Sequence, residues 1–171
     1  MQHTPMQTGS PPPSIEPTGF FSGVQIVPVI IGVVVDYIAT EIAMAAFIFG
    51  YVAKELSKQG ELTDEAIAKY IVTPEGLTAV LIIGSVCTAL GGFVAARRAG
   101  ALEIKHGAFV GLGSLIVSLV QHSTQQQSME LPEWFNFASI VAVIPAGAVG
   151  GFVASVLKTG GTLNQPKPPG S

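Results

Sequence analysis

Charged side chains are scarce in this sequence. Asp, Glu, Lys and Arg make up 11% of its 171 residues, whereas hydrophobic residues make up 49%. Soluble domains typically carry about 25% charged residues. The composition therefore excludes an ordinary soluble domain and predicts an integral membrane protein.

Other features that would define a function are also absent. The single cysteine, Cys87, cannot form a disulfide within the chain. The formal net charge is −3 and no Lys or Arg cluster is present, which excludes a nucleic-acid partner, because such partners require clustered positive charge. The phosphate-loop, HExxH, GxSxG and CxxC motifs are missing, and no acids have metal-ligand spacing. We therefore expect no enzyme, no cofactor and no metal.

Four apolar segments each approach the roughly 20 residues that a helix needs to cross a bilayer. They predict transmembrane helices over 24–53, 77–97, 104–122 and 134–158, within a membrane domain covering 23–158. A short surface helix is expected over 64–72, with Thr63 as its N-cap. The expected fold is an all-α, four-helix transmembrane bundle.

The two ends of the sequence have a different composition. Residues 1–22 and 159–171 are rich in proline and glycine and poor in large apolar side chains, which predicts disordered tails. The N-terminal tail has no Lys or Arg ahead of the first apolar segment. This favours a retained first helix over a cleaved signal peptide.

Basic residues predict how the bundle is oriented. Arg97, Arg98 and Lys105 lie in the short second connection and Lys158 follows the last helix, whereas the third connection has no basic residue. Because Lys and Arg concentrate in cytoplasmic loops, both termini are expected in the cytoplasm. The first connection carries lysines that oppose this assignment.

Small residues recur at helical spacing along the apolar segments. The run ALGGFVA at 89–95 returns as AVGGFVA at 148–154. In lipid, small residues let helix backbones approach closely, so they predict packing within the bundle or between copies. A pore lining or a hinge is the alternative. The packing candidates are Gly84, Gly91, Gly92, Gly107, Gly111, Gly147, Gly150 and Gly151.

The first apolar segment carries an unexpected polar cluster. Asp36, Tyr37, Thr40 and Glu41 share a sector of about 140° on a helix. A charge at the centre of a membrane helix costs about 2.5–3.5 kcal/mol, so this face is expected to look inward.

Three interpretations of the two acids remain open. They form hydrogen bonds between helices, with Ser114, Ser118 and Thr88 as partners; one of them pairs with Arg97; or they form a proton or cation relay. His106 and His122 lie near opposite ends of the third segment, too far apart to share a metal, and are expected to be solvated.

Several stretches together resemble small bacterial four-helix membrane proteins of unknown function. They are IGVVVDYIATEI, LGGFVAARRAG, KHGAFVGLGSLIVSL and IPAGAVGGFVASVL. The resemblance implies this fold and a bacterial inner-membrane location, and it implies no activity. It points to Asp36, Thr40, Gly91, Gly92, Arg97, His106 and Gly107. Ala39 stands where such proteins carry glycine, and Glu41 is an additional acid.

The expected function follows from these features. The protein is predicted to be a structural or accessory subunit that packs through small-residue helix faces, with lipid and other membrane subunits or further copies of itself as partners. The alternative is a small oligomeric transporter or channel that uses Asp36 and Glu41.

Overall fold

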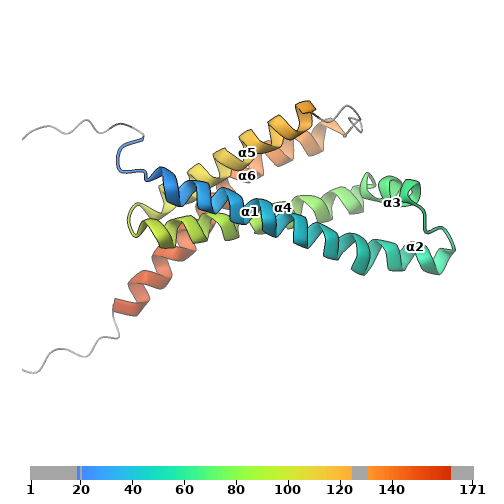
Figure 1. Ribbon diagram of the computed structural model, residues 1–171, viewed down its shortest axis with the longest axis horizontal. Helices are drawn as coiled ribbons and strands as arrows, with labels where there is room; N and C mark the ends of the chain where they lie inside the picture. Colours follow the sequence, from blue (N-terminus) through green and yellow to red (C-terminus); the bar gives the residue numbers. More distant parts are fainter. Residues whose placement is uncertain (1–18, 20, 125–130, 163–171) are drawn as a thin grey trace, which may run out of the picture.

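The computed structural model describes residues 19, 21–124 and 131–162. Within these residues the chain is helical and contains no strand (Figure 1). The elements are α1 (Ile26–Phe47), the π-helical turn η1 (Ile48–Val52), α2 (Ala53–Gln59), α3 (Asp64–Ile71), α4 (Pro74–Ala99), α5 (Glu103–Thr124) and α6 (Glu133–Thr162).

Four of the described helices are long and apolar enough to cross a membrane, which confirms the predicted fold class. They are Ile26–Gln59, Pro74–Ala99, Glu103–Gln121 and Glu133–Thr159. The first helix ends at Gln59 rather than at residue 53, and α6 continues to Thr162 rather than ending at residue 158. The predicted disordered tails lie mostly outside the described residues.

Local sequence explains where the helices begin and end. The first membrane helix runs through α1, η1 and α2 for 34 residues, about 51 Å at 1.5 Å per residue, so it extends beyond a hydrocarbon core of about 30 Å. Gly60 ends it in a left-handed conformation with φ 76°. The Thr63 hydroxyl accepts a hydrogen bond from the Ala66 amide at 3.1 Å and begins α3. Thr73 caps α4 in the same way through Gly76, also at 3.1 Å.

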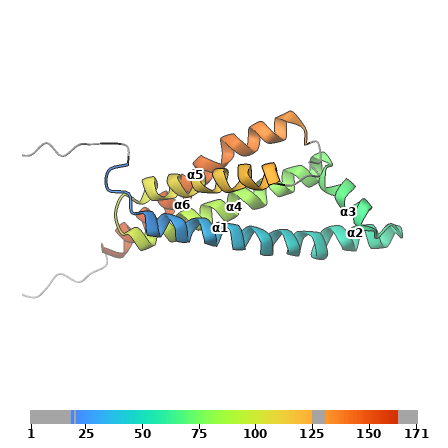
Figure 2. The same cartoon turned by 45° about the horizontal axis from the view of Figure 1, so that its top comes forward.

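Helices α4 and α5 form the centre of the bundle. Both contact α1 and α6, whereas α1 and α6 do not touch each other within the described chain. At one end α1 begins, α4 turns into α5 and α6 ends, and we call this the closed end. Toward α2 and α3 the pair α1 and α4 diverges from the pair α5 and α6, and we call this the open half (Figures 1 and 2).

Glycines bring the helices together around the closed end. A Cβ added to Gly150 would lie 2.7 Å from the Phe93 amide nitrogen, so the two GGFVA runs meet where α4 and α6 cross. A Cβ on Gly107 would lie 2.9 Å from the Gly151 amide nitrogen. Since real Cβ atoms do not approach so closely, these positions require glycine.

Seven of the eight packing candidates make such contacts between helices of the same chain. They are Gly91, Gly92, Gly107, Gly111, Gly147, Gly150 and Gly151. Gly84 differs, because a Cβ added there meets nothing within 4 Å. The tight packing thus surrounds the closed end and does not reach the open half.

Replacing Gly92 by Leu tests this packing. The new side chain has no space against α6, so we expect a loss of roughly 1–3 kcal/mol of folding free energy or more. Gly50→Leu is the matched control, since nothing lies within 4 Å of a Cβ at that position. Maleimide labelling of Cys87, which is 6% exposed, measures the outcome. Equally slow labelling of the two variants would contradict the prediction.

Candidate functional site

Asp36 lies halfway along α1, about a third of the way along the 34-residue first membrane helix. It is ten residues beyond Ile26, which is about 15 Å along the helix axis. This distance equals half the thickness of a hydrocarbon core of about 30 Å. Its side chain is buried, with 5% of its surface exposed. A carboxyl group at this depth requires polar partners, because lipid offers none.

Hydroxyl groups from three helices provide those partners. The Ser114 hydroxyl of α5 donates a hydrogen bond to Asp36 Oδ2. The Thr88 hydroxyl of α4 lies 3.2 Å from both carboxyl oxygens, and the Thr40 hydroxyl of α1 lies 3.4 Å from Oδ1. These are the contacts expected of Asp36 as a hydrogen-bonding link between helices, with Thr88 and Ser114 among the three partners predicted for it.

Gly91 makes this arrangement sterically possible. A Cβ added to Gly91 would lie 2.9 Å from Asp36 Cβ, and one added to Gly32 would lie 2.7 Å from the Gly91 carbonyl oxygen. Helices α1 and α4 therefore touch backbone to backbone at the level of the carboxyl group. A larger residue at either glycine would move Asp36 away from Thr88.

The Thr88 hydroxyl has two possible hydrogen-bond acceptors, the Asp36 carboxyl group and a backbone carbonyl. Its oxygen is also 2.9 Å from the carbonyl oxygen of Gly84, one turn earlier in α4. Because a hydroxyl has one proton, it donates either to Gly84 or to Asp36. When it donates to Gly84, its oxygen can accept a hydrogen bond from a protonated Asp36. The site therefore fits both the acid and the carboxylate after one hydroxyl rotation.

A cavity of about 450 Å³ extends from Asp36 into the open half. Helices α4, α5 and α6 form most of its walls, and α1 contributes Asp36 and Thr40. Apolar side chains such as Leu81, Leu115 and Val143 alternate with polar ones. The polar lining residues are Asp36, Thr40, Ser85, Thr88, Ser114, Ser118, Asn136 and Ser139. A volume of this size is typical of sites that hold small organic molecules.

The other members of the predicted polar cluster do not join Asp36 inside the bundle. Tyr37 is 45% exposed and Glu41 is also exposed, so the expectation that all four residues look inward is wrong for these two. They line a smaller hollow of about 100 Å³ between α1 and α5, which also reaches Asp36. Asp36 and Thr40 face inward, and Tyr37 and Glu41 face the surface.

Arg97 does not pair with Asp36. It follows Thr88 by nine residues, which places it about 13 Å farther along α4. Its guanidinium lies 5.5 Å from the centre of the Phe93 ring, and no ion pair within the described chain includes it. The predicted pair fails because Arg97 belongs to the closed end and Asp36 to the middle of the bundle.

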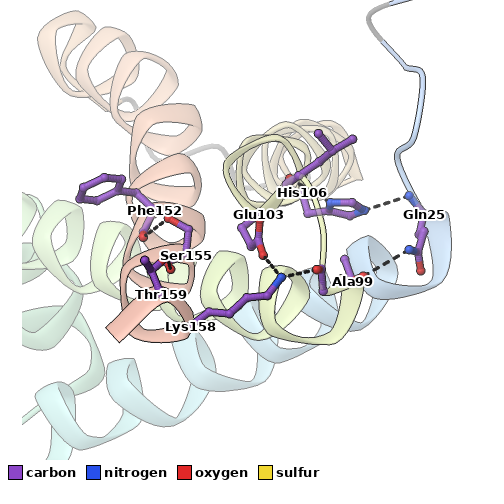
Figure 3. Close-up of polar contacts among 10 residues, drawn as sticks. Gln25, Ala99, Glu103, His106, Phe152, Ser155, Lys158 and Thr159 are labelled. Atoms are coloured by element: carbon purple, nitrogen blue, oxygen red, sulfur yellow. Dashed lines mark hydrogen bonds and ion pairs between the residues drawn. The ribbon is translucent and has the colours of Figure 1, made fainter. Parts of the chain in front are cut away.

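His106 is fully buried at the closed end, contrary to the expectation of a solvated residue. The backbone amide of Gln25, the residue just before α1, donates a hydrogen bond to His106 Nε2 at 2.9 Å (Figure 3). Nδ1 lies 3.1 Å from the Leu102 carbonyl oxygen, to which it can only donate. These partners select the neutral imidazole with its proton on Nδ1. Sequence reasoning missed this contact, because Gln25 and His106 are 81 residues apart in the chain. The side chain of His122 lies outside the described residues.

Lys158, near the end of α6, forms polar contacts with the turn between α4 and α5. Its ammonium lies 2.8 Å from Glu103 Oε1 and donates to the Gly100 carbonyl oxygen (Figure 3). The Gln25 side chain similarly donates to the Ala99 carbonyl oxygen at 3.3 Å. Polar contacts therefore connect all four membrane helices at the closed end.

These features define a multi-pass α-helical membrane protein with a buried carboxyl group at the inner end of a cavity. Comparison of the chain with protein-family models, curated proteins and solved structures finds no match. The resemblance to small bacterial four-helix proteins therefore stays a prediction. Within the described residues, no three His, Cys, Asp or Glu side chains are grouped so that they could hold a metal ion.

A double-mutant cycle tests the hydrogen bond between Ser114 and Asp36. Ser114→Ala should lower the free energy of unfolding by about 1–3 kcal/mol, because the buried carboxyl group of Asp36 loses one of its three hydroxyl partners. In an Asp36→Ala background the same change should cost much less. Unfolding is followed through the fluorescence of Trp134, the single tryptophan. The control is Ser155→Ala, whose hydroxyl donates to Phe152 within α6. Equal losses in both backgrounds would contradict the contact.

Proposed function

We propose that this protein is a small membrane transporter in which Asp36 binds the transported species, without catalysing a chemical reaction. One observation carries the proposal. The carboxyl group is buried within a membrane helix, at the inner end of a cavity, and beyond it the bundle is closed by glycine packing. Intramembrane acids commonly mark ion and proton pathways.

The geometry of the carboxyl group fits reversible binding. Its three hydroxyl partners can stabilise a carboxylate, and rotation of the Thr88 hydroxyl accommodates the protonated acid. A cation that approaches through the cavity would therefore exchange with a proton at Asp36. Asp36 would carry out the exchange alone, because Glu41 lies on the surface of the bundle.

Transport also requires access from the other side of the membrane. In this conformation the glycine contacts, the hydrogen bond of His106 and the ion pair of Lys158 block access to Asp36 from the closed end. We propose that α1 and α4 move against α5 and α6 so that the closed end opens while the open half closes. Rigid movement of helix groups around a fixed central site is a general transport mechanism.

Replacing Asp36 by Asn tests the role of the carboxyl group. The amide cannot exchange a proton but preserves the shape of the side chain. In proteoliposomes with an imposed proton gradient, we expect proton flux to fall to the level of protein-free liposomes. The matched control is Asp64→Asn at the first residue of α3, outside the membrane helices. Flux that survives in Asp36→Asn would rule out the proposed role.

A second candidate function is supported by the exposed face of α1. A charged residue near the centre of a membrane helix costs about 2.5–3.5 kcal/mol when it faces lipid, yet Glu41 is exposed there beside Tyr37. Another membrane protein subunit or a further copy of the chain would cover this face. The protein would then be an accessory or oligomeric subunit that docks through α1 rather than through its glycines, which the bundle already uses.

The distribution of positive charge supports a location and an orientation. Arg97 and Arg98 in the last turn of α4, Lys105 near the start of α5 and Lys158 near the end of α6 share the closed end. By the rule that positive residues stay inside, this end and both termini would be cytoplasmic. The resemblance to bacterial proteins favours the inner membrane.

Native mass spectrometry tests the assembly. Protein extracted from its own membrane in mild detergent should carry a stoichiometric foreign subunit or a defined number of copies of itself. Glu41→Arg should reduce that assembly at least tenfold, because the added bulk and reversed charge disrupt the covered face. The control is Glu61→Arg, an exposed acid in the connection after α2. A monomeric wild-type protein would count against the docking face.

A further inference from the structure

The chemistry of the cavity limits what it can hold. Asp36 is its single ionisable lining residue, and none of the described side chains that line it is basic. An anion would therefore meet a buried carboxyl group with no compensating charge. A cation would meet an acid whose described partners are hydroxyl groups and include no positive side chain.

The size and lining of the cavity indicate a ligand larger than a metal ion or a proton. A metal ion or a proton needs polar ligands and little space, whereas this cavity has about 450 Å³ and is lined on several sides by Leu81, Leu115 and Val143. Phe135 is also part of the lining and is 8% exposed. An aromatic face attracts cations as well as apolar groups. The cavity thus combines one acidic group with walls whose surface is mostly apolar.

We infer that the cavity binds an organic cation, with the positive group toward Asp36 and the apolar body against α4, α5 and α6 in the open half. This inference rests on the proposed transport function and names its substrate class. Polar groups along the walls, such as Ser139 and Asn136, are positioned to form hydrogen bonds with the body of the ligand. A small cavity ligand of this kind is held by many apolar contacts and a few polar ones.

Two probes of the same shape and opposite charge test the inference. Tetraphenylphosphonium is an organic cation and tetraphenylborate is its anionic counterpart. Equilibrium dialysis against the purified full chain, in a neutral detergent, should show saturable binding of the phosphonium at one site per chain. The borate should bind at least tenfold more weakly. Absence of saturable phosphonium binding, or equal binding of the two probes, would overturn the inference.

Two variants locate the bound cation. Asp36→Asn should weaken phosphonium binding at least tenfold by removing the charge. Gly84→Leu should do the same by filling the cavity, and it should fold normally because nothing lies within 4 Å of a Cβ at that position. Gly50→Leu, which also has free space but does not line the cavity, is the control. Unchanged binding in a folded Gly84→Leu protein would show that the cation binds elsewhere and would overturn the inference.

The proton-flux experiment separates this inference from the function on which it rests. Proton flux that depends on Asp36, without saturable phosphonium binding, would reject the organic cation and retain the transporter. If the wild-type protein showed neither Asp36-dependent proton flux nor saturable phosphonium binding, both the transport function and the organic-cation substrate would be rejected. Competition by phosphatidylethanolamine identifies the source of a bound cation: displacement of the phosphonium indicates the ammonium of a membrane lipid, and no displacement indicates a cation that enters from water. Either result supports a cation site.

Discussion

Close backbone contact at glycines is the constraint on which the rest of this bundle depends. In lipid no hydrophobic drive holds apolar helices together, so van der Waals contact between backbones has to do so. The contacts at Gly92, Gly107 and Gly147 join α4, α5 and α6 from Asp36 toward the closed end. No glycine contact continues them at Gly84, which lines the cavity between α4, α5 and α6. The cavity therefore exists because the tight contacts stop there.

Asp36 depends on the same contacts. Burial of a carboxyl group is unfavourable unless hydrogen-bonding partners compensate for the lost water. The partners come from α1, α4 and α5, so they meet at one point only if these helices are within backbone contact, and Gly32 and Gly91 allow that approach. The glycine pair and the carboxyl group thus form one unit, in which packing provides the polar surroundings that the acid needs.

The sequence was sufficient for the features that are local to one helix. Hydrophobic length predicted the four membrane helices, and a buried acid predicted hydroxyl partners such as Thr88 and Ser114. Features that depend on how helices are placed against each other were not predictable. Helical periodicity put Glu41 on the same face as Asp36 but could not say where that face meets α5. It also could not show that Arg97 lies a different distance along the bundle.

The proposed transport requires the closed end to open. Its polar ties are few, and Lys158 and Glu103 form a pair whose lysine is 55% exposed, so the pair adds little stability. The stronger constraint is the glycine packing, which brings helix backbones into direct contact. The movement that we propose, of one helix pair against the other, would therefore have to separate glycine contacts at one end and close the cavity at the other, with Asp36 between the two.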